Sequence, residues 1–129
     1  METVLITGTN RGIGYQFAQK FLLRGDRVLA TCRSIEIADE LKQLGVTHPN
    51  LEILELDVSC SESMQDFPHL LHGEAIDIFV NNAVVYGPQS SAFGAINGPA
   101  WAEVLQINAI APLLLTQLII DNLRKGKDK

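Results

Sequence analysis

The sequence predicts an α/β fold built on a parallel β-sheet with helices on both faces. Short apolar runs alternate with longer amphipathic stretches, and this alternation is typical of strand–helix–strand units. A glycine-rich turn follows the first apolar run, Val4–Ile6, and opens the first amphipathic stretch. With 129 residues, 47% hydrophobic and 19% charged, the chain can form one globular domain with a full core.

Four strands and four helices are expected. The strands are predicted at residues 3–7, 27–31, 51–56 and 76–80, and the helices at residues 12–24, 34–45, 59–71 and 99–123. Gly25 ends the first helix, Ser34 is expected to cap the second, and Ser59 or Ser61 the third. Pro68 lies inside the third helix and predicts a kink or a break there.

Right-handed crossovers between parallel strands place the four strands in the order 3-2-1-4. The result is a Rossmann-like sheet, and ligands of such sheets bind where the strand order reverses, here between the first and fourth strands. The C-terminal half of a doubly wound sheet is expected to be absent. Residues 1–123 would then form a shortened dinucleotide-binding domain, and residues 124–129 a charged, frayed tail.

Composition narrows the classes of function. A net charge of -5 argues against nucleic-acid binding, which needs a basic surface. The longest apolar run is too short to span a membrane, and Met1 and Glu2 leave no room for a signal peptide before the first strand. We therefore expect a cytoplasmic protein with reduced cysteines. The three histidines have no partners at metal-ligand spacing, so no metal site is expected.

The stretch Thr7–Gly14 is predicted to bind a pyrophosphate. A glycine turn lets the backbone approach a ligand closely, and the following helix N-terminus offers N–H groups and a positive dipole end. Three residues separate Gly8 from Gly12, and one separates Gly12 from Gly14. The common dinucleotide fingerprint instead has one residue between its first two glycines.

This T-G-x-x-x-G-I-G spacing resembles the short-chain dehydrogenase/reductase family, and three further stretches match in order. They are Asp57-Val58, Asn81-Asn82-Ala83, and Ile107-Asn108-Ala109. The resemblance implies that Asp57 and the next backbone group hold the adenine, and that Asn108 is the asparagine of the family's catalytic tetrad. The cofactor-binding residues that it implies are Gly8, Asn10, Arg11, Gly12, Ile13, Gly14, Asp57, Val58, Asn82 and Ala83.

Charge near the second strand favours NADP(H) over NAD. An NAD site has a carboxylate about 20 residues after the glycines, whereas this chain has Thr31-Cys32-Arg33 at the corresponding place. Arg33, together with Arg11, offers guanidinium donors to a 2′-phosphate. The alternative is that both arginines are ordinary solvated surface residues. Within the family, the chain looks most like carbonyl-reductase-type members, which implies carbonyl or alcohol substrates.

The chain departs from the family pattern in two respects. Val84 stands where the family has glycine, and it would be strained if that position needed a positive φ. The family's catalytic Ser and Tyr-x-x-x-Lys are absent, because Tyr15 is followed four residues later by Gln19 and Tyr86 by Ser90. Without a proton donor, this chain alone is expected to be inactive, although the family-level activity is an NADP(H)-dependent oxidoreductase.

Asn108 has two interpretations. Pro112 lacks the N–H that would bond to the Asn108 carbonyl, which predicts a freed carbonyl and a kink. In the family the matching backbone is understood to hold a water of the proton relay. The alternative is a structural kink with no chemical role.

The open edge of the fourth strand and the apolar last helix predict that the chain is not a monomer. An unpaired strand edge invites pairing, and leucines and isoleucines surround the helix from Leu113 to Ile120. We expect a homo-oligomer or half of a larger assembly. Two other functions stay open: a non-catalytic NADP(H)-binding protein, and a module that binds partner proteins through its last helix.

Overall fold

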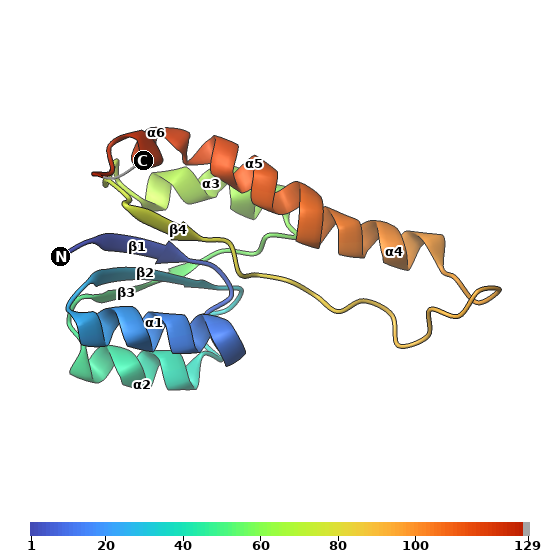
Figure 1. Cartoon of the computed structure of the whole chain (residues 1–129), viewed down its shortest axis with the longest axis horizontal. Coiled ribbons are helices and arrows are strands. Elements are labelled where there is room, and N and C mark those ends of the chain that lie inside the picture. The colour runs from blue at the N-terminus through green and yellow to red at the C-terminus, as the bar shows by residue number, and fades with distance from the viewer. Residues whose placement is uncertain (128–129) are drawn as a thin grey trace.

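The computed structural model describes residues 1–127 and has a parallel sheet at its centre, with helices on both faces (Figure 1). The strands are β1 (Thr3–Ile6), β2 (Arg27–Cys32), β3 (Leu51–Glu55) and β4 (Ile78–Val80). Their order is β3-β2-β1-β4, which confirms the predicted order. In the register, Leu5 of β1 lies between Leu29 of β2 and Phe79 of β4.

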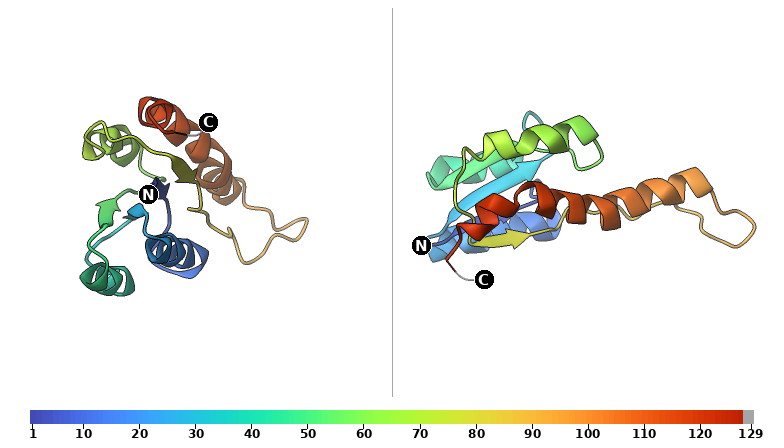
Figure 2. Two further views of the ribbon diagram at one scale, coloured as in Figure 1. Left: turned by 60° about the vertical axis from the view of Figure 1, so that its left-hand side comes forward. Right: turned by 90° about the horizontal axis from the view of Figure 1, so that it is seen from above.

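Helices cover the two faces unequally. They are α1 (Gly12–Arg24), α2 (Asp39–Thr47), α3 (Ser61–Leu70), α4 (Gly98–Leu105), the π-helical η1 (Gln106–Ile110), α5 (Ala111–Leu118) and α6 (Ile120–Arg124). Helices α1 and α2 lie on one face, and α3, α5 and α6 lie on the other (Figures 1 and 2). Helix α4 and the loop before it extend beyond the sheet, and α4 has no buried residue.

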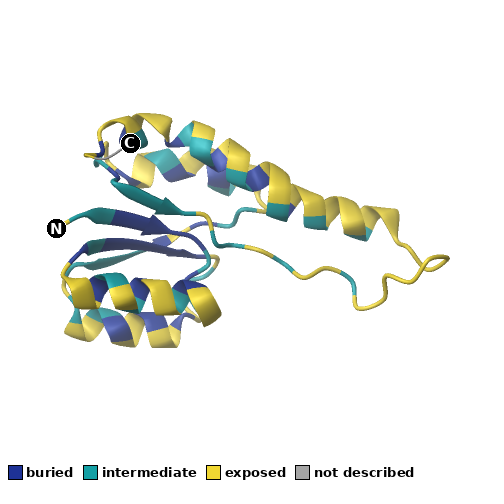
Figure 3. Cartoon of the chain, viewed as in Figure 1, coloured by how far each residue is buried: buried dark blue, intermediate teal, exposed yellow. Residues whose placement is uncertain are grey.

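The two sheet faces bury separate apolar clusters, as expected for a parallel sheet covered on both sides. Successive strand residues point to opposite faces, so Leu5 belongs to the cluster under α3 and α5, whereas Val4 and Ile6 belong to the cluster under α1 and α2. Figure 3 shows the central strands as the most buried part of the chain and the α4 arm as mostly exposed. The sheet is therefore a stable base for the loops at its carboxyl edge.

Two predicted helix caps are wrong. Helix α2 begins five residues after Ser34, because residues 35–38 first form a turn in which the Ala38 N–H donates to the Ile35 carbonyl at 3.2 Å. That turn brings Ala38 into the core under α1 and α2. Helix α3 begins at Ser61 with no side-chain cap, because Cys60 rather than a serine is its N-cap residue, and the Ser59 hydroxyl bonds to Asp57. Pro68 lies inside α3, which ends two residues later at Leu70.

The long last helix contains a π-helical turn in place of a sharp kink. In η1 the Ala111 N–H donates to the Gln106 carbonyl, five residues earlier. This wider turn accommodates Pro112, which has no N–H to donate. Figure 1 shows α4 and α5 continuing through it as one helix. No helix within residues 1–127 is long and apolar enough to cross a membrane, and the cytoplasmic location stays a prediction.

Residues 125–127 of the predicted tail are bonded to the rest of the domain. The Lys125 ammonium donates to the Gly73 carbonyl at 2.9 Å, and the Lys127 N–H donates to the Asp77 carboxylate at 2.8 Å. Gly126 is buried against the Ile76 carbonyl, where a Cβ would lie 2.3 Å from the oxygen. Asp128 and Lys129 lie outside the described residues. The division into a domain of residues 1–123 and a tail stays a prediction.

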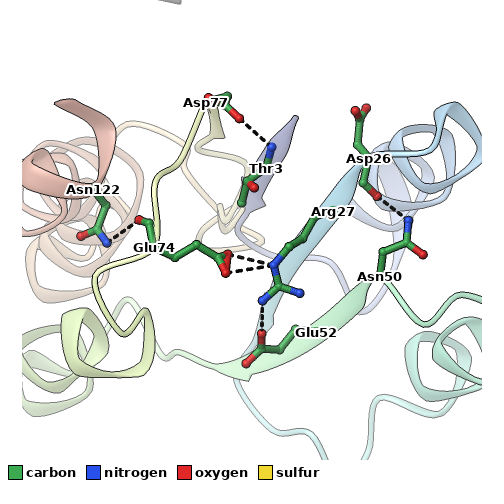
Figure 4. Close-up of polar contacts among 8 residues, drawn as sticks. All are labelled: Thr3, Asp26, Arg27, Asn50, Glu52, Glu74, Asp77 and Asn122. Carbon is green, nitrogen blue, oxygen red and sulfur yellow. Dashed lines mark hydrogen bonds and ion pairs between the residues drawn. The ribbon is translucent and has the colours of Figure 1, made fainter. Parts of the chain in front are cut away.

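Polar contacts join the amino ends of the strands (Figure 4). Arg27, at the start of β2, bonds to the carboxylates of Glu74 at 2.9 Å and Glu52 at 2.6 Å. Asp26 is 3% exposed, and its carboxylate accepts the Glu2 N–H and the Arg24 guanidinium. Burial alone would raise the pKa of Asp26, but these two donors hold it below the ordinary value of 3.8.

We predict that Asp26→Asn lowers the free energy of unfolding at neutral pH by about 1–3 kcal/mol, because a buried charge-assisted hydrogen bond is lost. Since the folded pKa is lowered, the carboxylate stabilises the fold above its unfolded pKa and stops doing so as the pH falls through the folded value. Urea unfolding at neutral pH and at strongly acidic pH measures both effects. Asp121→Asn, at a carboxylate with a side chain 84% exposed, is the control. Equal stability of wild type and Asp26→Asn at neutral pH would contradict the prediction.

Candidate functional site

The turn between β1 and α1 depends on glycine at three positions. Gly8 and Gly12 have φ angles of 67° and 59°, a region that glycine enters without steric cost. Gly14 is buried, and a Cβ there would lie 2.1 Å from the Gly8 carbonyl oxygen. A side chain is therefore excluded at Gly14, and the start of α1 packs directly on the turn. The predicted strand–turn–helix unit is present.

Thr7 joins this turn to the end of β4. Its side chain is fully buried, and its hydroxyl oxygen accepts the N–H groups of Asn82 at 2.9 Å and Ala83 at 3.0 Å. The Asn82 amide in turn donates to the Gly8 carbonyl at 3.1 Å. Sequence reasoning placed Thr7 in the predicted pyrophosphate-binding stretch but did not predict its bonds to the segment after β4. A threonine that ends an otherwise apolar strand is the signal that could have indicated them.

Thr9 joins the same turn to the end of β2. Its N–H and its hydroxyl both donate to the Thr31 carbonyl, at 3.0 and 2.9 Å. Arg11 lies two residues beyond Thr9, and Arg33 lies two residues beyond Thr31. Both arginine side chains are exposed at the carboxyl edge of the sheet. The threonine bonds therefore hold the segments that carry the two guanidinium groups next to each other.

The N-terminus of α1 has neither a side-chain cap nor an acidic residue in its first turn. Arg11 is the N-cap residue, in an extended conformation. Ile13 is exposed, and Asn10 is partly buried. The positive end of the helix dipole is thus available to a negatively charged ligand.

Asp57 follows β3 on the same edge of the sheet, two strands away from β1. One carboxylate oxygen, Oδ1, accepts the Ser59 N–H at 2.9 Å and the Ser59 hydroxyl at 2.6 Å. The Asp57 N–H donates to the Ser63 hydroxyl at 2.9 Å. These bonds fix the carboxylate and leave its second oxygen, Oδ2, for a further donor. Val58 is partly buried against the core under α3 and α5.

Asn108 holds the base of the loop after β4. Its amide oxygen accepts the Val85 N–H at 2.9 Å, and its amide nitrogen donates to the Val85 carbonyl at 2.8 Å. Asn81, for which no role was predicted, donates to the Pro112 carbonyl at 3.3 Å. The side chain of Asn108 therefore has a structural role, and a catalytic role stays a prediction.

Val84 is accommodated without backbone strain. Within residues 1–127, His72 is the one non-glycine residue with a positive φ, so Val84 does not adopt the conformation that would be costly. Its side chain is 64% exposed. The glycine of the family pattern is therefore not required here for backbone conformation.

Eight of the predicted site residues fall into two groups. Gly8, Gly14, Asn82 and Ala83 are in contact, while Arg11, Arg33, Asp57 and Val58 are spread along the same edge of the sheet.

Among residues 1–127, no three His, Cys, Asp or Glu side chains gather as metal ligands would. An open hollow of about 560 Å³ also lies on α1 and is lined by Ile13, Gln16, Phe17, Lys20, Phe21 and Arg24.

The profile of the short chain dehydrogenase family matches residues 2–128. This chain belongs to the short-chain dehydrogenase family. A short-chain dehydrogenase of Penicillium roqueforti is 33% identical over 97% of the chain. An NADPH-bound carbonyl reductase from chicken liver shares 34% identity over 97% of the chain, with a TM-score of 0.86. A carbonyl reductase of Pseudomonas aeruginosa shares 32% identity over 95% of it, with a TM-score of 0.87.

The family member described here spans part of the length of these proteins. It covers 33% of the Penicillium relative, 52% of the chicken reductase and 57% of the Pseudomonas reductase. The four-stranded sheet and the glycine turn thus correspond to about half of a carbonyl reductase.

We predict that Thr7→Val destabilises the fold by about 1–3 kcal/mol, because two partly buried N–H groups lose their acceptor and water can replace it only in part. Thr7→Ser keeps the hydroxyl and is expected to cost less than about half of that amount. Thermal or urea unfolding of the two variants measures the difference. Equal destabilisation by valine and serine would show that the hydroxyl does not hold β1 to β4.

Proposed function

We propose that this chain is the cofactor-binding half of an NADP(H)-dependent oxidoreductase that acts on carbonyl or alcohol substrates. The observation that carries the proposal is the glycine turn, which Thr7 bonds to the end of β4 and Thr9 bonds to the end of β2. This turn lies where the strand order reverses, between β1 and β4. The similarity to an NADPH-bound carbonyl reductase supports the same assignment.

The residues present fit a dinucleotide. The pyrophosphate would lie on the turn from Gly8 to Gly14, where a Cβ on Gly14 would clash with the backbone and where the uncapped α1 N-terminus faces the ligand. Asp57 would accept from the adenine through Oδ2, and Val58 would contact it by its backbone. When bound, NADPH supplies a hydride for the reduction of a carbonyl carbon.

The preference for NADP(H) rests on two exposed arginines. Arg11 and Arg33 lie on segments that the Thr9–Thr31 bonds hold together, and the residue after β2 is this arginine rather than a carboxylate. Guanidinium groups bind phosphate through paired charge-assisted hydrogen bonds. A carboxylate at this position would instead favour the ribose hydroxyls of NAD.

We predict that Arg33→Glu weakens NADPH binding by about tenfold or more, because a charge-assisted bond to the 2′-phosphate is worth about 1.5–3 kcal/mol. NADH affinity should change much less, since NADH has no 2′-phosphate. Fluorescence titration with both nucleotides measures the ratio. Lys20→Glu is the control, because it makes the same change of charge on α1, away from the segment that carries Arg33. Unchanged NADPH affinity in Arg33→Glu would refute the proposed cofactor preference.

The chain alone is proposed to lack catalysis. Neither of its tyrosines, Tyr15 and Tyr86, is followed by a lysine four residues later, so no proton donor of the family type is present. The contribution of Asn108 would be to position the loop after β4 through its two bonds to Val85. An assay of NADPH oxidation with a panel of carbonyl compounds tests this, because turnover by this chain alone would contradict it.

We also propose that the chain assembles through its last helix. From Ile78 to Ile120 the sequence contains a single charged residue, Glu103, although the whole chain has 25. Several large apolar side chains on this span are exposed, and Leu113 is 70% exposed. Charged residues are depleted in the centres of protein interfaces. The exposed apolar side chains of the last helix therefore form a face whose composition resembles that of a protein interface.

We predict that the chain is a dimer or larger and that Leu113→Asp shifts it towards monomer, because burying a carboxylate in an apolar interface is costly. Light scattering over a dilution series measures the mass of both proteins. Leu23→Asp is the matched control, since Leu23 is 72% exposed and lies outside the last helix, on α1, which also carries Lys20 and Arg24. A wild-type chain that is monomeric at all concentrations would contradict the prediction.

The same exposed face favours a second candidate function, a module that binds partner proteins and no longer binds a nucleotide. The NADPH titration separates the two functions, because the module would bind no nucleotide. A chain that binds NADPH but has no activity in any longer form would instead be a non-catalytic NADP(H)-binding protein.

A further inference from the structure

A cavity of about 250 Å³ lies between α3 and the η1–α5 part of the last helix, which run side by side on one face of the sheet (Figures 1 and 2). Two of its lining residues, Val58 and Leu118, pack against the apolar cluster under α3 and α5. The lining includes Ser59 and Gln65 from α3 and the segment before it, and Gln106 and Gln117 from η1 and α5. Of the residues proposed to hold the nucleotide, only Val58 also lines this cavity.

The lining has no charged side chain. It combines four apolar residues with two hydroxyls and three amides, the latter from Gln65, Gln106 and Gln117. An ion entering the cavity would gain no counter-charge from the lining, whereas a neutral polar group could form hydrogen bonds with its amides and hydroxyls while the rest of the molecule contacts the apolar residues. The volume is slightly below the roughly 300 Å³ at which sites for drug-sized ligands begin. The cavity therefore suits a small, uncharged molecule with an apolar ring.

The cavity is connected to the proposed adenine contact. Ser59 lines the cavity, and its N–H and hydroxyl are the two donors that hold the Asp57 carboxylate, at 2.9 and 2.6 Å. Val58, the next residue after Asp57, also lines it. A ligand that contacts Ser59 would compete for this hydroxyl or move the segment, and either change alters the position of Asp57.

We propose that the cavity between α3 and α5 binds a small uncharged ligand, an apolar ring carrying a neutral amide or hydroxyl group. We further propose that binding changes nucleotide affinity through the bonds between Ser59 and Asp57. The second part rests on the proposed function, and the first part does not.

The first test compares benzamide with benzoate on the ¹⁵N-labelled 129-residue chain. The two probes have the same ring, but benzoate carries a charge. Benzamide is expected to shift the amide signals of the lining residues and to bind about fivefold or more tightly than benzoate. Equal affinity for the two probes, or shifts confined to residues outside the lining, would overturn the proposal.

The second test fills the cavity. Gln65 lines it, and Asp66, the next residue on α3, does not, although both are exposed. Gln65→Trp is expected to weaken benzamide binding about tenfold or more, whereas Asp66→Trp retains wild-type affinity. Both variants are checked for wild-type folding by circular dichroism. Retained binding in a folded Gln65→Trp protein would place the ligand elsewhere and refute the site.

The third test measures coupling. Saturating benzamide is expected to change NADPH affinity about twofold or more. Ser59→Ala should reduce this change, measured at benzamide concentrations that saturate the variant, whereas Ser59→Thr keeps the hydroxyl and should retain it. Unchanged NADPH affinity in the wild type would overturn the coupling and leave the cavity site supported by the first two tests. A chain that binds benzamide but no NADPH would overturn the proposed function and the coupling together, again without affecting the cavity site.

Discussion

The buried hydroxyl of Thr7 is the contact on which the candidate site depends. Strands β1 and β4 are neighbours in space but are separated by more than 70 residues in the sequence, and this hydroxyl accepts two N–H groups directly after β4. Because the acceptor is fully buried, water can replace it only in part. The position of Asn82 and Ala83 against the glycine turn follows from this one oxygen, and the Asn82 amide then completes the contact by bonding to Gly8.

The fold was predictable because its signals are local and repeated. The strands coincide with the apolar runs of the sequence, and the glycine-rich stretch forms the tight turn that was expected between the first strand and the first helix. Crossover handedness then left one order for four strands, and that order is observed. The start of α2 was not predictable from Ser34. The helix begins later because residues 35–38 form a turn that buries Ala38 against residues distant in the sequence.

The polar contacts of the site were harder to predict than its glycines. The spacing of the glycines is visible in the sequence and predicts a turn. The partners of Thr7, Thr9 and Asn108 are backbone groups, which every residue type provides, so the sequence does not indicate which ones they are. For the same reason Pro112 indicated a disturbed helix without indicating its form, which is a π-helical turn rather than a sharp kink. Sequence patterns identify which residue is unusual, while the fold decides which group it contacts.

The two bonds between Asn108 and Val85 mark a boundary in the segment after β4: the residues up to Val85 are bonded to the rest of the domain, and those beyond it are mostly exposed. The part from Asn81 to Val85 is held to the turn and to the last helix, whereas the tip beyond it is mostly exposed, with Phe93 fully so. Insertions or substitutions at the tip would therefore leave the glycine turn undisturbed. The residues at the exposed tip can therefore vary without changing the residues that shape the glycine turn.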